Sequence, residues 1–167
     1  MPSSRCMSRN DCRSQFMQAG FSLVEVMITV VIVAVLAMVA LPVFQKQIAK
    51  GRRADAIGAL STIVQAQERL RSNRGSYAST MEDAELAKLA FANNLTPKRH
   101  YQLSLVGLGN PPDFTFGFIA RAAASSDSPQ AHDSDCATMF IQLRGGNMSY
   151  GATDSAGSDS SQKCWPR

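Results

Sequence analysis

The feature that most constrains this chain is one long apolar stretch close to its N-terminus. Between Phe21 and Phe44, 20 of 24 residues are apolar and Glu25 is the only charged residue. A helix of that length is about 36 Å long, which exceeds the hydrocarbon core of a bilayer at about 30 Å. The stretch is therefore expected to form a transmembrane helix.

A cleaved secretory signal is the main alternative for such a stretch. Signal peptides have an apolar region of about 7–15 residues that ends in a cleavage site of the Ala-x-Ala type. This stretch is longer, and its alanines Ala34, Ala37 and Ala40 are spaced by three, so that pattern does not occur in it. We therefore expect the helix to remain in the mature protein. Basic residues flank both ends, so the positive-inside rule leaves the orientation open.

Two residues inside the stretch need an explanation. The carboxylate of Glu25 is costly in a bilayer, so it either reaches the interface or waits for a cationic partner. Pro42 removes one backbone hydrogen bond, so it either ends the helix or kinks and loosens a helix that continues.

Helical signals continue beyond the proline. Apolar residues recur at a spacing near 3.6 from Ile48 to Leu70, with cations and glutamines between them. This pattern predicts one helix from about Phe21 to Ser72, apolar all round in its first half and amphipathic in its second. Gly75 is expected to stop it.

Beyond Gly75 the pattern changes to an alternation of apolar and polar residues, which is typical of strands. The segment from Met81 to Asn93 is expected to be a short helix or an irregular loop. Gly145 and Gly146 predict a tight hairpin, and the polar stretch from Ala124 to Asp135 predicts a surface loop. Four runs alternate, at 101–105, 114–118, 137–143 and 148–152. The amphipathic half of the helix would cover one face of a four-stranded antiparallel sheet, which makes the fold α+β.

The four cysteines form two pairs, Cys6 with Cys12 before the apolar stretch and Cys136 with Cys164 near the C-terminus. An even pair in a small exported head predicts one disulfide between Cys136 and Cys164. Two free buried thiols are the alternative.

Candidate chemistry is sparse. The composition, 45% hydrophobic and 18% charged, excludes a disordered polymer and a polytopic membrane protein, and a net charge of +4 gives no reason to invoke nucleic acid. The stretch from Lys98 to Tyr101 could contact nucleic acid, but a charged edge before a strand is commoner. His132, Asp133, Asp135 and Cys136 match no metal-ligand spacing, so neither a metal nor another cofactor is expected. No catalytic motif is found, so an enzyme is not expected.

One short motif is more specific. Gly20 and Phe21, with Glu25 four residues after Phe21 and the apolar stretch following, resemble the N-terminus of a type IV prepilin. Pro42 also matches this family, and the C-terminal cysteine pair resembles PilE-like minor pilins of Gram-negative bacteria. The resemblance covers residues 19 to about 78 well, while the head matches only in topology and cysteines.

The resemblance implies processing and assembly. A prepilin peptidase would cut between Gly20 and Phe21 and N-methylate Phe21, and the new amine could meet Glu25 of a neighbouring subunit in the filament. Pro42 could let the helix bend during extraction from the membrane. Cys6 and Cys12 would be discarded with the leader.

The family also implies an organisation and a location. Residues 1–20 would be a cytoplasmic leader, 21–44 the membrane and filament-core half of the helix, 45–74 the amphipathic half and 75–167 the head. The subunit would reside in the inner membrane with its N-terminus cytoplasmic and then enter the extracellular pilus. Its partners would be other pilins, the peptidase, the assembly machinery and, before assembly, membrane lipid.

The predicted function is that of a structural, non-enzymatic subunit of type IV pili, a minor pilin needed for pilus assembly. Twitching motility, adhesion and DNA uptake follow by resemblance alone. Two alternatives stay open: a pseudopilin of type II secretion, and a DNA-receptor pilin that uses Lys98, Arg99 and Arg144. Of the partners, DNA is the less favoured.

Overall fold

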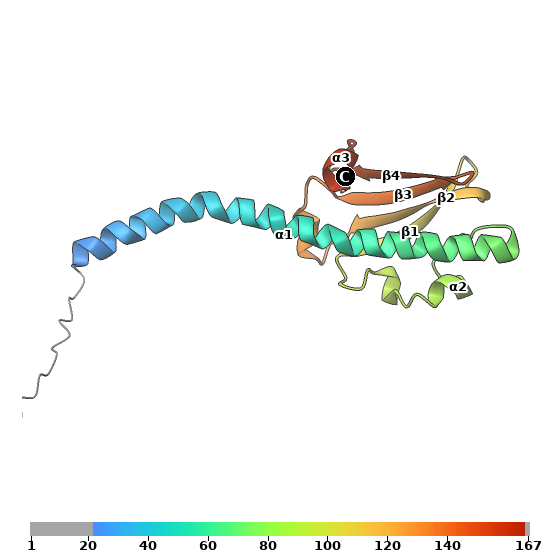
Figure 1. Ribbon diagram of the computed structural model, residues 1–167, viewed down its shortest axis with the longest axis horizontal. Helices are drawn as coiled ribbons and strands as arrows, with labels where there is room; N and C mark the ends of the chain where they lie inside the picture. The colour runs from blue at the N-terminus through green and yellow to red at the C-terminus, as the bar shows by residue number, and fades with distance from the viewer. Residues whose placement is uncertain (1–21, 166–167) are drawn as a thin grey trace, which may run out of the picture. The chain divides into compact units, whose positions relative to one another are not determined.

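The computed structural model describes residues 22–165 (Figure 1). A long helix, α1 (Leu23–Arg74), precedes a head built on one sheet. The chain divides between Ala40 and Leu41 into two units, and each is described by itself. The other elements are α2 (Ala84–Ala87), η1 (Ala92–Asn94), β1 (Tyr101–Leu108), β2 (Asp113–Ala124), η2 (Pro129–His132), β3 (Thr138–Arg144), β4 (Asn147–Thr153) and α3 (Ser161–Cys164).

Helix α1 confirms the prediction of one continuous helix, with Pro42 inside it. The alternative that the helix ends at Pro42 is wrong. The helix ends at Arg74, where Gly75 adopts a positive φ of 78° and its N–H donates to the carbonyl of Arg71 at 2.7 Å. A left-handed residue at this position is a common helix stop, and glycine adopts it without a steric penalty.

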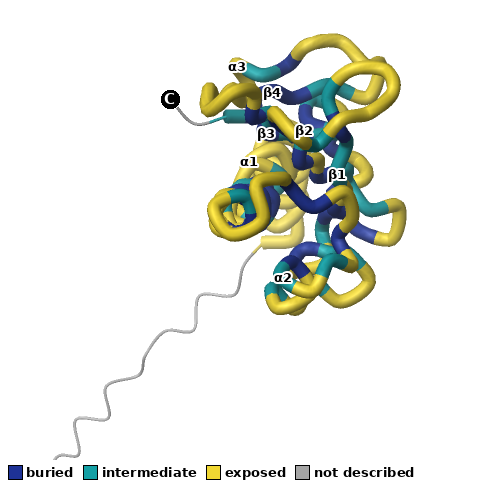
Figure 2. The backbone as a smooth tube through the Cα atoms, turned by 90° about the vertical axis from the view of Figure 1, so that its right-hand side faces the viewer, coloured by how far each residue is buried: buried dark blue, intermediate teal, exposed yellow. Residues whose placement is uncertain are grey.

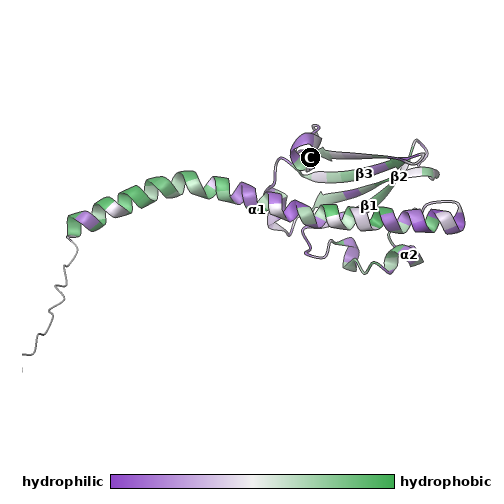
Figure 3. Cartoon of the chain, in the orientation of Figure 1, coloured by the Kyte–Doolittle hydropathy of each residue, from purple (hydrophilic) through white to green (hydrophobic). Residues whose placement is uncertain are grey.

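The two halves of α1 have different surroundings. In the first unit and up to Phe44, the large apolar side chains are between 49% and 76% exposed, and they give that half its apolar colour in Figure 3. Among the described residues, α1 is the one helix long and apolar enough to cross a membrane. From Ala56 to Leu70, apolar residues at helical spacing are buried in the head.

The head confirms the predicted four-stranded antiparallel sheet, in the order β1-β2-β3-β4. The first two strands pair from Tyr101 with Ala124 to Gly107 with Phe118, where the register shifts. Gly145 and Gly146, both at positive φ, close the hairpin between β3 and β4. The sequence left the segment 81–93 as a short helix or a loop, and it holds the four-residue α2 followed by η1, at 92–94.

The core lies between α1 and the inner face of the sheet (Figure 2). Leu60 and Ile63 of the helix are fully buried with Phe118 of β2. The side chain of Gln67 lies in the same layer. Its amide donates to the carbonyl of Ala78 at 3.0 Å and accepts from the N–H of Ala78 at 2.8 Å. The glutamine is tolerated in the core because both of its polar ends are satisfied.

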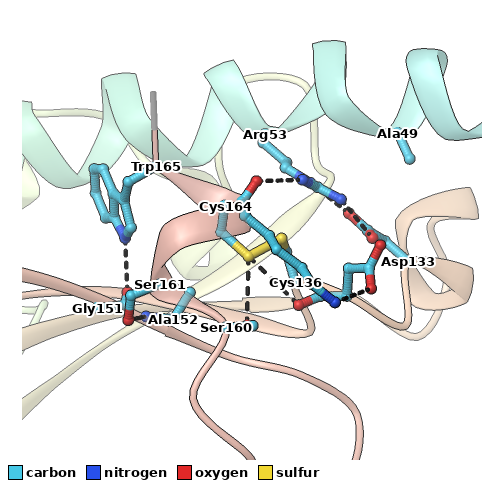
Figure 4. The surroundings of a disulfide bond; sticks show 12 residues. Ala49, Arg53, Asp133, Cys136, Gly151, Ala152, Ser160, Ser161, Cys164 and Trp165 are labelled. Atoms are coloured by element: carbon cyan, nitrogen blue, oxygen red, sulfur yellow. Dashed lines mark hydrogen bonds and ion pairs between the residues drawn. A yellow bond between two sulfur atoms is a disulfide. The ribbon is translucent and has the colours of Figure 1, made fainter. Parts of the chain in front are cut away.

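The predicted disulfide between Cys136 and Cys164 is present (Figure 4). Cys136 is fully buried and Cys164 nearly so, and the bond ties α3 to the segment before β3. In the chain-entropy treatment, closing a loop of 28 residues stabilises the fold by about 3 kcal/mol.

The stretch 124–135 is only partly the surface loop that was predicted. Ser128, Gln130 and Asp133 are buried. The carboxylate of Asp133 accepts two hydrogen bonds from the guanidinium of Arg53 at 2.8 Å each, and a third from the amide of Gln130 at 2.6 Å. These polar side chains enter the interior because they satisfy one another, which composition alone does not reveal.

Candidate functional site

The assembly residues lie in the first unit and at its border. Gly20 and Phe21 fall outside the described residues. Glu25 lies in the first turn of α1, exposed among apolar side chains, and forms no ion pair with any described residue. A carboxylate in the first turn interacts favourably with the helix dipole. Its charge remains available to a cation from outside this chain.

The head presents a second surface of interest, the sheet face turned away from α1, which we call the outer face. It consists of the outward residues of the paired parts of the strands: Gln102, Ser104 and Val106; Gly117, Ile119, Arg121 and Ala123; Thr138, Phe140, Gln142 and Arg144; and Asn147, Ser149, Gly151 and Thr153. None of these residues is acidic. The nearest carboxylate along β2 is Asp113, four residues before Gly117. The strand residues of the outer face are mostly polar, their charged members are both arginines, and Asp159 adjoins the face where it bridges to Thr153 at its edge.

Two arginines project from the outer face. Arg121 is exposed and lies opposite Ser104 on one side and Phe140 on the other. Arg144 is exposed and lies opposite Gly117, four residues along β2 from Arg121. At about 3.4 Å per residue their backbones are about 14 Å apart. Neither side chain has a hydrogen-bond or ion-pair partner among residues 22–165.

Lys98 and Arg99 lie in the turn that precedes β1, and both are exposed. The N–H of Arg99 donates to the carbonyl of Thr96 at 2.7 Å, and the N–H of Lys98 donates to the carboxylate of Asp55 at 3.3 Å. These backbone bonds fix the turn, and neither cationic side chain has a partner in the described part of the chain.

The three cations considered for nucleic-acid contact therefore do not form one cluster. Lys98 and Arg99 adjoin the sheet end where Ala123 pairs with Thr138, and Arg144 is at the other end, six residues along β3. That separation is about 20 Å. Arg121 lies between the two ends, on the same outer face as Arg144. The sequence reasoning missed Arg121, although its odd position in a strand with buried even positions could have revealed it.

Several other cations already have a partner. Arg53, Arg74, Lys88 and Lys163 each form an ion pair with a carboxylate. Arg71 instead donates to the hydroxyl of Tyr77 at 2.6 Å, and this bond raises the pKa of Arg71. Lys98, Arg99, Arg121 and Arg144 keep a free charge, as do Lys46, Lys50, Arg52 and Arg69 of α1, and they differ from those four by lying on or next to the sheet.

The residues once considered for a metal have other roles. Asp133 is committed to Arg53, and Cys136 is oxidised in the disulfide. Asp135 accepts from the ammonium of Lys163 at 3.4 Å.

Two families of known proteins match the chain. The prokaryotic N-terminal methylation motif matches residues 16–41, which include the predicted cleavage position and all but the last three residues of the apolar stretch. The family described as type IV minor pilin ComP, DNA uptake sequence receptor, matches residues 42–140. This second match spans more than half of the 167 residues. It includes all of the outer face up to Phe140, and Arg144 lies four residues beyond it.

These matches confirm the resemblance to type IV prepilins and favour a pilus subunit over a secretion pseudopilin. The family is one of structural pilins, and its N-terminal helix fits anchoring in the inner membrane followed by incorporation into the pilus. The chain therefore belongs to the family of the type IV minor pilin ComP, and it is a type IV minor pilin.

Proposed function

We propose that this minor pilin is a DNA receptor of the pilus and that duplex DNA binds along its outer face. The observation that carries the proposal is the match over residues 42–140 to a family described as a DNA uptake sequence receptor. From the sequence alone DNA was the least favoured partner, and this match is the reason for proposing it now. The free cations of the outer face supply the physical support.

Electrostatics makes this face a suitable binding surface for DNA. DNA affinity comes largely from cations that neutralise phosphates and release bound counterions. Arg121 and Arg144 of the outer face are exposed and unpaired among the described residues, and Arg99 is an exposed, unpaired cation in the turn that adjoins one end of the sheet. An arginine that already pairs with a carboxylate, such as Arg74 with Asp83, would have to give up that partner first.

The polar residues between the arginines can support sequence preference. Gln102 and Gln142 each carry an amide donor and acceptor, and such amides read adenine when they reach the major groove. Phosphate contacts would position the duplex, while these amides would discriminate between bases.

The test is equilibrium binding of a fluorescent duplex to the purified full chain in detergent, followed by anisotropy. We expect the variant R99Q/R121Q/R144Q to bind roughly tenfold more weakly or worse. The matched control is K46Q/K50Q/R52Q, which loses the same charge from unpaired cations of α1. Unchanged affinity in the first variant, or equal losses in both, would reject the outer face as the binding surface.

We also propose that the subunit is processed and assembled as its leader implies. Cleavage between Gly20 and Phe21 on the cytoplasmic side would create a methylated amine on Phe21. That amine would pair with Glu25 of a neighbouring subunit, because a carboxylate in apolar surroundings is tolerable when paired and costly when alone. Pro42, which lies next to the division between the two units, would let the helix loosen during transfer into the filament.

Mass spectrometry of the mature subunit tests the first step, with N-methylated Phe21 as the expected terminus. A terminus after Ala40 would contradict it. For the second step, Glu25→Ala should be processed normally yet be absent from sheared pili. Thr29→Ala is the matched control, because the Thr29 hydroxyl already donates to the carbonyl of Val26 at 2.8 Å. Normal incorporation of Glu25→Ala would refute the pairing.

A further inference from the structure

We propose that the basal surface of the head binds the headgroups of anionic phospholipids while the subunit is anchored in the membrane. The basal surface is the end of the second unit at which the chain enters it, close to Leu41. Its residues line two hollows of about 490 Å³ each. Its defining residues are Lys46, Lys50, Arg52, His132, Lys163 and Trp165.

Positive charge dominates this surface. The two hollows are lined by five lysines and arginines but by only two carboxylates, those of Asp133 and Asp135. Both carboxylates are already paired, Asp133 with Arg53 and Asp135 with Lys163. The side chains of Lys46, Lys50 and Arg52 form no ion pair or hydrogen bond with any residue from 22 to 165. Three positive charges are thus left for an external anion.

The place of these cations along the chain identifies the anion. Lys46 follows the last apolar residue, Phe44, by two positions, and Lys50 follows it by six. Along a helix these intervals are about 3 and 9 Å, and the headgroup layer on one side of a bilayer is about 5–8 Å deep, so Lys46 lies within that layer and Lys50 at its outer limit. Cations so close to a membrane exit meet lipid phosphates before any other anion, and anionic headgroups attract such clusters.

Trp165 adds an interfacial aromatic to the same surface. Its ring shares the second hollow with Lys50 and Lys163 and is half-buried. The indole N–H donates to the carbonyl of Gly151 at 2.8 Å (Figure 4). The ring is also tilted against Tyr150, with centroids 4.9 Å apart. Tryptophan is enriched at headgroup depth because its body is apolar and its edge is polar.

The proposed lipid contacts belong to the subunit before assembly, while it is still anchored in the membrane. Before assembly, lipid phosphates would hold the head against the bilayer with a fixed face down. When the subunit leaves the membrane for the filament those contacts would break, and the cations of the basal surface would again be free to bind other anions. The proposal needs no DNA binding, and the residues involved are separate from the outer face.

The experiment uses the full chain reconstituted into bilayers, with Trp165 as reporter, since it is the only tryptophan of the sequence. Quenching of the tryptophan fluorescence by brominated acyl chains is measured in two bilayers, one of phosphatidylcholine alone and one in which phosphatidylglycerol makes up about a third of the lipid. We expect at least a twofold increase in quenching over phosphatidylcholine alone, reversed by about 0.5 M salt.

The variant K46Q/K50Q/R52Q should lose this increase. The control R69Q/R121Q/R144Q removes three unpaired cations from other parts of the head and should retain it. A wild-type circular dichroism spectrum and thermal unfolding curve for the first variant verify that its head is folded. Equal quenching in both lipids, or equal loss in both variants, would overturn the proposal. So would a basal variant that keeps wild-type quenching but is lost from pili, because that result assigns the cations to a neighbouring subunit.

Discussion

The buried ion pair between Arg53 and Asp133 gives the sharpest stability prediction. Each residue is 8% exposed, and the two guanidinium bonds are 2.8 Å long. Arg53 also donates to the carbonyl of Lys163 at 3.1 Å, and Gln130 donates to the same carboxylate at 2.6 Å. The pair therefore joins α1 to η2 and α3, three segments far apart in the sequence.

Asp133→Asn keeps the shape of the side chain but removes its charge and one acceptor. Whichever way the new amide is turned, its NH₂ group faces an N–H of Arg53, and the guanidinium charge stays buried. Breaking one side of a buried pair typically costs about 3–5 kcal/mol. For a head of this size, that corresponds to a fall in Tm of roughly 10 °C or more.

Thermal and urea unfolding of the full chain, followed by circular dichroism, measure this effect. The exposed pair between Lys88 and Glu85 is the control, and Glu85→Gln should cost less than about 0.5 kcal/mol. The double variant R53M/D133L should be markedly more stable than Asp133→Asn, because no unpaired charge remains. A loss below about 1 kcal/mol for Asp133→Asn, or a double variant no better than it, would refute the reasoning.

Three further predictions concern the sheet, the disulfide and acid. Gly117→Ala should destabilise the head by about 1–3 kcal/mol, because its Cβ would clash with the carbonyl oxygen of Leu143. Gly58→Ala in α1, with open space around it, should stabilise the head by roughly 0.5–1 kcal/mol. Equal effects in urea unfolding would contradict this contrast. Replacing Cys136 and Cys164 by serine should lower the free energy of unfolding by about 3 kcal/mol, and reductant should then have no further effect. The hydrogen bonds from Thr115 lower the pKa of Asp113. The ionised carboxylate therefore stabilises the fold above the ordinary aspartate pKa, and this stabilisation is lost as the pH falls through the lowered pKa. Asp113→Asn should make the free energy of unfolding less dependent on pH in this acid range, and an unchanged dependence would contradict the assignment.

The regular parts of the fold could be predicted because each has a strong local period. The 3.6-residue spacing from Ile48 to Leu70 and the alternation in the four strands are imposed by burial on one side, so they are visible in the residues themselves. Gly75 marked the helix end for a different local reason, because the left-handed conformation that stops a helix favours glycine. The disulfide followed from a pair of cysteines in an exported head.

The interior of the segment 124–135 could not be predicted. Asp133 and Gln130 would be expected at the surface, because no neighbouring residue in the sequence indicates a hydrogen-bond partner for them. The partner of Asp133, Arg53, lies 80 positions away. Burial of such groups depends on a tertiary encounter that makes their hydrogen bonds. A polar stretch between two strands is usually exposed, and here it is exposed only in part.

The candidate interface was predicted in its parts but not in its arrangement. Lys98, Arg99 and Arg144 stood out as cations beside strands, yet only the register of the sheet shows that they lie at opposite ends. Arg121 became visible once the inner and outer faces were distinguished. The free or paired state of each cation also depends on contacts between distant segments, so it required the structure.

The central claim is that DNA binds the outer face through its free cations. The most direct test is the slope of log K against log salt for duplex binding to the full chain. Each lost phosphate contact lowers the magnitude of that slope by about 0.9. R99Q/R121Q/R144Q should therefore lower it by roughly 2 to 3, while K46Q/K50Q/R52Q should leave it unchanged. Identical slopes for the wild-type chain and R99Q/R121Q/R144Q would contradict the claim.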